Sequence, residues 1–173
     1  MAKSYKHAAL ICWVLSILSA VGIVAGIYFK QPLIIIGIMI PVVVYQVYRT
    51  QGRFTTFASV AILVVLAVEA FFIIKKPDID FASLAEKISG EAGAALFENF
   101  NPLIAGPAVI AFLALFLMRK TWGRYTIWLA IIILITSVGL VYTVDPEFFK
   151  NLLNTFFESL RDTGYSYWMR YIR

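Results

Sequence analysis

Five long runs of apolar residues follow one another along the chain, separated by polar segments. The runs cover residues 8–29, 33–48, 54–74, 102–118 and 125–144. A helix needs about 20 apolar residues to cross the hydrocarbon of a bilayer, and each run reaches or approaches that length. The pattern therefore predicts five transmembrane helices. The second and fourth runs are short and contain Pro41 and Pro107, where the missing backbone donor predicts a kink or locally broken hydrogen bonding.

The links between the runs differ in length and charge. Residues 30–32 predict a tight hairpin, whereas 49–53 and 119–124 are short, basic and contain glycine. The link 75–101 is much longer, and its sequence "SLAE" at 83–86 matches a capping box, in which Ser and Glu satisfy backbone donors at a helix start. We therefore expect an interfacial helix within the 75–101 loop.

The C-terminal segment, residues 145–173, has a different pattern. Large apolar residues recur there at the spacing of three and four that marks one face of a helix. This apolar strip consists of Phe149, Leu152, Leu153, Phe156, Phe157 and Leu160. Asp145 and Pro146 are typical of a helix start, and we expect Gly164 to end the helix. An amphipathic C-terminal helix of this kind lies in a membrane interface or against another protein.

Together these elements predict an all-α integral membrane protein with two parts. The first is a polytopic bundle of about five transmembrane helices over residues 1–144, and the second is the amphipathic segment 145–173. Composition supports this class, because 61% of the 173 residues are hydrophobic and only 14% are charged, whereas soluble domains carry about a quarter charged residues. The first run is too long for an ordinary signal-peptide core, so we interpret it as an uncleaved helix.

The net charge of +5 does not indicate a nucleic-acid partner. Basic residues stand singly or in twos and threes at the ends of the apolar runs, which is the pattern of helix flanks in a lipid bilayer. They are more numerous in the short links on the N-terminal side. The basic residues of the long tail belong to the other side and weigh less in this rule, so we favour an N-terminus on the inside. The expected location is the bacterial inner (plasma) membrane.

Glu69 is the one charged residue inside an apolar run. It lies five residues before the end of the third run, roughly 8 Å below the membrane boundary at 1.5 Å per residue. Carboxyl groups inside membranes are candidates for proton or cation handling, so Glu69 is a candidate ion or proton site. The alternative is a structural carboxyl held by hydrogen bonds, which the shallow depth favours. The groups expected within reach are Tyr28, Lys76, Asn101, Thr136, Ser137 and Tyr142.

The first run also carries small residues at helical spacing, namely Ser19, Gly22 and Gly26. Small side chains let two helix backbones approach closely. We favour packing inside the bundle, and a contact between subunits is the alternative. Near the basic end of the second run, Gln46 is expected to hydrogen-bond a neighbour.

The arrangements of residues that carry out catalysis do not occur in this sequence. There is no nucleophile with an adjacent base, no phosphate-binding glycine loop and no metal-binding spacing of Cys and His. We therefore expect no enzyme, no cofactor and no metal. The contact surfaces favour a non-catalytic structural, assembly or accessory subunit of a membrane complex, whose partners are other membrane subunits or further copies of itself. The alternative is a small ion or proton channel or transporter that uses Glu69.

Overall fold

A computed structural model describes residues 7–50, 52–75, 102–121 and 123–171. Over these ranges the chain is all-helical, with 94% helix and no strand. The helices are α1 (Ala8–Phe29), α2 (Pro32–Arg49), α3 (Arg53–Lys75), α6 (Pro102–Lys120), α7 (Arg124–Val144) and α8 (Pro146–Tyr171). The interfacial helix expected within the 75–101 loop falls outside the described residues.

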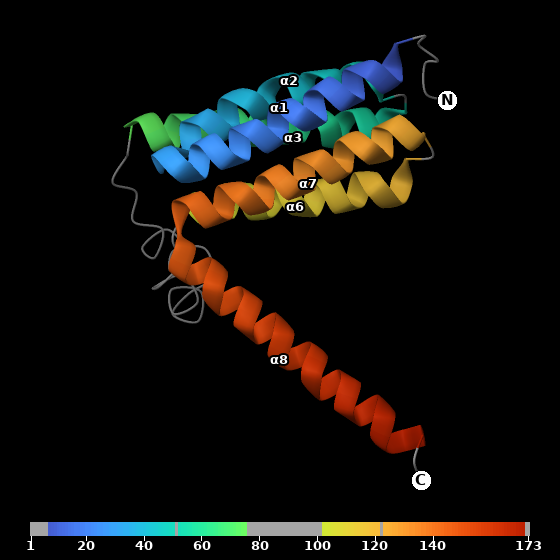
Figure 1. Cartoon of the computed structure of the whole chain (residues 1–173). Coiled ribbons are helices and arrows are strands. Elements are labelled where there is room, and N and C mark those ends of the chain that lie inside the picture. Colours follow the sequence, from blue (N-terminus) through green and yellow to red (C-terminus); the bar gives the residue numbers. More distant parts are fainter. Residues whose placement is uncertain (1–6, 51, 76–101, 122, 172–173) are drawn as a thin grey trace, which may run out of the picture.

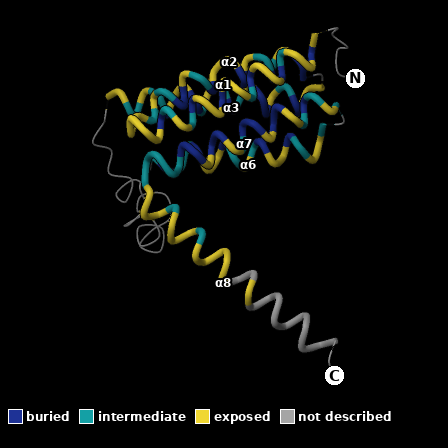
Figure 2. The backbone as a smooth tube through the Cα atoms, viewed as in Figure 1, coloured by how far each residue is buried: buried dark blue, intermediate teal, exposed yellow. Residues whose placement is uncertain are grey.

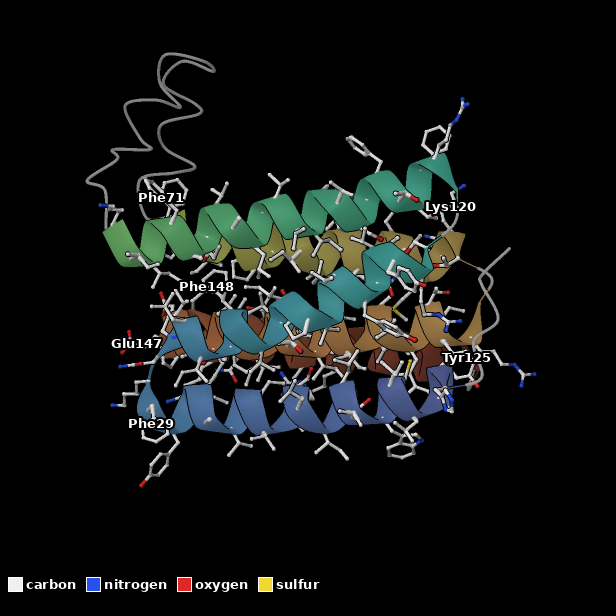
Figure 3. The ribbon with its side chains drawn as sticks, turned by 90° about the horizontal axis from the view of Figure 1, so that it is seen from above. Phe29, Phe71, Lys120, Tyr125, Glu147 and Phe148 are labelled. Atoms are coloured by element: carbon white, nitrogen blue, oxygen red, sulfur yellow. The ribbon has the colours of Figure 1, made fainter. Side chains whose placement is uncertain are left out.

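Helices α1, α2, α3, α6 and α7 are each long and apolar enough to cross a membrane. The five predicted runs are therefore confirmed as helices, and the helix ends lie within two residues of the ends of the runs. The five helices lie side by side and alternate in direction (Figure 1). One end of the bundle holds Lys120 and Tyr125, whereas Phe29 and Phe71 lie at the other end, where α7 runs into α8 (Figure 3). We call these the basic end and the α8 end.

Four of these helices form a closed ring. Helix α2 packs against α3, α3 against α6, α6 against α7, and α7 against α2, while α1 lies outside the ring and packs on α2 and α7. The interior of the bundle is apolar and fully buried, with Met39, Ile62, Ile110, Leu117 and Ile133 among its residues. Figure 2 shows the buried positions on the inner faces of the helices and the exposed positions on the outer faces.

The outer faces of the bundle are apolar as well. Phe57, Phe112 and Ile135 are each more than half exposed. A soluble protein rarely leaves large apolar surfaces bare, and extended surfaces of this kind mark contacts with a membrane or with another protein.

Neither internal proline ends its helix. Helices α2 and α6 continue through Pro41 and Pro107, so the prolines interrupt at most the local backbone hydrogen bonding, as the sequence predicted they would do. The hairpin between α1 and α2 is confirmed. Lys30 adopts the left-handed conformation with φ of 53°, and the N–H of Gln31 donates to the carbonyl of Gly26 at 3.0 Å. This turn closes the end of α1 and reverses the chain.

Helix α8 leaves the bundle after a single non-helical residue and slants away from it (Figure 1). That residue is Asp145, whose carboxylate Oδ1 accepts a hydrogen bond from the N–H of Phe148 at 2.9 Å. The predicted helix start is therefore confirmed. The predicted end at Gly164 is wrong, because α8 continues to Tyr171. A glycine inside a helix costs only about 1 kcal/mol relative to alanine, and no proline follows it here.

Candidate functional site

Glu69 is almost fully buried near the α8 end of α3, with 2% of its surface exposed. Its carboxyl group packs directly on the backbone of α6 at Gly106. A Cβ atom placed on Gly106 would collide with the Glu69 carboxyl, so the space that this group occupies exists only because residue 106 is a glycine. The two residues join α3 to α6 across the ring.

One oxygen of the Glu69 carboxyl lacks the hydrogen bond that the sequence led us to expect. Its Oε1 atom is buried and has no partner among the described residues. The hydroxyl of Thr136 instead donates to the carbonyl of Ile132 at 2.7 Å, and the hydroxyl of Ser137 donates to the carbonyl of Pro107 at 2.5 Å. Both hydroxyls are therefore engaged with helix backbone.

No hydrogen bond joins Glu69 to Tyr28 or Tyr142, the two other expected neighbours that the structure describes. Tyr28 lies on α1, outside the ring, with 80% of its surface exposed. The ring of Tyr142 packs on Phe149, with centroids 5.4 Å apart. Lys76 and Asn101 fall outside the described residues. The sequence singled out Glu69 as an acid inside an apolar run, and it gave no sign of the contact with Gly106.

A second group of buried polar residues lies at the basic end. It joins α2, α3 and α7 and consists of Gln46, Arg49, Thr50, Ser59 and Thr126. The Gln46 amide donates to the carbonyl of Thr126 at 3.4 Å. The sequence predicted a hydrogen bond for this side chain without naming the partner. The Thr50 hydroxyl donates to the carbonyl of Gln46 at 2.5 Å and lies 3.2 Å from the hydroxyl of Ser59. This polar cluster links the three helices through side chains.

Arg49 belongs to this polar cluster, although the sequence placed it in the short basic link 49–53. Only 3% of its surface is exposed. Its guanidinium lies 5.1 Å from the centroid of the Tyr125 ring and donates to the hydroxyl of Tyr45 at 3.5 Å. The spacing to Gln46 was the available signal, since residues three apart share a helix face.

The small residues of α1 face α2. Ser19, Gly22 and Gly26 are all buried. A Cβ atom on Gly22 would lie 2.6 Å from Cδ1 of Ile38, and one on Gly26 would overlap the side chain of Ile35. The glycines thus allow α1 and α2 to approach closely, which favours packing inside the bundle over a contact between subunits.

The apolar strip of α8 is only partly covered. Phe149 and Leu153 are half-buried, whereas Leu152, Phe156 and Phe157 are exposed. The side chain of Leu160 falls outside the described residues. Helix α8 contacts α7, and Phe149 rests on Tyr142 near the joint. Beyond that contact Leu153 is half-buried, and Leu152, Phe156 and Phe157 are exposed.

Comparison of the chain with protein-family models, with curated proteins and with solved structures gives no match. Over the described residues the chain is an all-helical bundle, with five helices long and apolar enough to cross a membrane.

Proposed function

We propose that the chain is an integral membrane protein in which α1, α2, α3, α6 and α7 span the bilayer. The length of these helices and the apolar outer faces of the bundle support this insertion. The basic end lies on the inside, because short links rich in Lys and Arg stay there. The proposed location is the bacterial inner membrane.

We further propose that it acts as a non-catalytic assembly or accessory subunit of a membrane complex. The observation that carries this proposal is the exposed part of the apolar strip on α8, where Phe156 and Phe157 are 55% and 63% exposed. A helix with one bare apolar face is stabilised when that face is covered by lipid or by protein. Because α8 slants away from the bundle, its own bundle covers only the first turns. The proposed partners are other membrane subunits or further copies of this chain.

Replacing Phe156 and Phe157 by Asp tests this function. Burying each Phe contributes roughly 1.5–3 kcal/mol, so the double variant is expected to lose its partner while the five spans still insert. The measurement is native mass in mild detergent, with co-purifying proteins identified by mass spectrometry. The matched control replaces Asn151 and Asn154 by Asp, which adds the same charge outside the strip.

Two results contradict the assembly function. One is a wild-type protein that purifies without partner as a 19.5 kDa monomer. The other is a Phe156→Asp, Phe157→Asp variant whose native mass equals that of the wild type.

A small proton or cation channel or transporter is the second candidate function. It is favoured by one observation, the burial of Glu69 with its Oε1 atom unpartnered in the described chain. Reconstitution of wild type and Glu69→Gln in liposomes separates the two candidates. The accessory function predicts no proton or monovalent-cation flux above empty liposomes from either protein. Wild-type flux that Glu69→Gln abolishes would establish the second candidate.

A further inference from the structure

The contact between Glu69 and Gly106 places a carboxyl group on a face of α3 that is otherwise apolar on this side of the polar cluster. The neighbouring positions that face inward on α3, Ile62 and Leu66, are fully buried hydrophobic residues. At Gly106 the α6 backbone leaves the room that the carboxyl fills. The glycine on α6 thus makes room for the acid on α3.

Among the described residues of α2, α3 and α6, no charged side chain lies beside this carboxyl to compensate an ionised form. Helix α3 packs on α2 and α6. The titratable residues of those two helices are Tyr45, Tyr48, Arg49, Arg119 and Lys120, all near the basic end. Arg119 is thirteen residues from Gly106, or about 20 Å along α6. On α3 itself, Arg53 is at the basic end and Lys75 is exposed at the other.

The groups around the Glu69 carboxyl determine whether it can bind a proton or a metal cation. An ionised carboxylate without donors or a counter-charge is far more costly to bury than the neutral acid. A metal cation requires several oxygen ligands, typically six or more for the divalent ions. Thr136 and Ser137 already donate to backbone carbonyls, and the described residues hold no group of three or more His, Cys, Asp or Glu. A single proton removes the charge without any of these.

We propose that Glu69, seated against Gly106, is a proton-binding site of the bundle. In this contact the carboxyl carries its proton at neutral pH and gives it up to water at alkaline pH, leaving the carboxylate. The proposal concerns binding and does not depend on the assembly function of α8, nor on transport across the membrane.

Infrared spectroscopy of the protein in liposomes tests the proposal through the carbonyl stretch of a protonated carboxyl. The wild type minus Glu69→Gln difference spectrum at neutral pH is expected to contain this band. The band is expected to disappear reversibly at alkaline pH. Glu147→Gln, which changes an exposed acid of α8, is the control and leaves the band in place. A neutral-pH difference spectrum that shows only ionised carboxylate overturns the proposal.

Gly106→Ala tests the part played by the glycine. The added methyl group takes the space of the carboxyl, so the protonated band is expected to be lost or shifted at neutral pH. Gly37→Ala is the matched control, because a Cβ there meets nothing within 4 Å. A folded Gly106→Ala protein with an unchanged band overturns the proposal. If this variant does not fold, the comparison with Glu69→Gln decides alone.

Replacing sodium by choline in the buffer distinguishes a proton from a metal cation. The band is expected to be the same in both buffers. A band that appears only when sodium is removed would show that a cation occupies the site, and would also overturn the proposal.

Discussion

Arg49 illustrates how a charged residue is accommodated at the edge of an apolar bundle. Its guanidinium lies over the Tyr125 ring, which offers a negative face to the cation. Three residues earlier, Gln46 bonds the carbonyl of Thr126, so two neighbouring polar side chains of α2 both reach α7. The polar cluster therefore fixes the basic end of α2 against α7 by direction-dependent contacts, which the apolar core does not provide.

The ring of Tyr125 is expected to support Arg49. Tyr125→Leu removes the aromatic face and should lower stability by about 0.5–2 kcal/mol, seen as a lower melting temperature in detergent. Tyr125→Phe keeps the face and is the control, with an expected melting temperature close to that of the wild type. Equal losses from both variants would show that the hydroxyl group, rather than the ring, is needed.

The sequence identified polar residues inside the spans more readily than it identified their partners. Glu69 stood out because every other residue of its run is uncharged. Gly106 did not, because a glycine in an apolar helix has many uses. For Arg49 the sequence offered only its spacing to Gln46, which shows that the two share a face of α2 but not that this face turns inward. Burial at a helix end depends on the neighbours that the fold brings there.

At the scale of elements, α1 is held to the ring by two kinds of contact. Its glycines meet the isoleucines of α2, and on the other side the indole N–H of Trp128 on α7 donates to the hydroxyl of Ser16 at 3.0 Å. Trp13 and Trp128 also pack edge to face, with centroids 5.5 Å apart. In a bilayer such close packing and hydrogen bonding hold helices together, because lipid is as apolar as the helix surfaces.

Gly26→Ile is expected to separate α1 from α2 locally. The larger side chain overlaps Ile35, and overpacking of this kind costs about 1–3 kcal/mol. The melting temperature should fall while the native mass stays that of the wild type. Gly37→Ile is the matched control, since that position is open. A changed native mass with an unchanged melting temperature would instead favour a contact between subunits.

Helix positions were predictable to within two residues because each span is bounded by features with a direct physical meaning. Basic residues at the ends and prolines at Pro32 and Pro102 mark where the apolar runs begin or stop. The end of α8 was not predictable in this way. Gly164 weakens a helix without preventing it, and the following residues supply no stronger signal to stop.

For the molecule as a whole, the asymmetry of charge is the main feature that the alternating helices create. The short links at the basic end carry Arg49, Arg53, Arg119, Lys120 and Arg124. Because Arg49 is buried, it adds less to the exposed charge of that end than the sequence implies. The other four remain exposed and still favour this end on the inside.

This orientation is testable with single cysteines in a Cys12→Ala background. Lys75→Cys at the α8 end should react with a membrane-impermeant maleimide on intact spheroplasts. Arg53→Cys at the basic end should react only after the membrane is permeabilised. Mass spectrometry of the labelled protein gives the readout, and the reverse pattern would place the N-terminus outside.

Asp145 is the single non-helical residue between α7 and α8, so a change in its backbone angles would rotate α8 as a whole. Helix α8 has 26 residues and is therefore about 39 Å long. A rotation of about 10° at its base displaces the far end, near Tyr171, by about 7 Å. The contact of Phe149 with Tyr142 and the hydrogen bond to Asp145 both lie within the first turn, next to the pivot. Small changes in the backbone angles of Asp145 would therefore change the distance of Phe156 and Phe157 from the bundle.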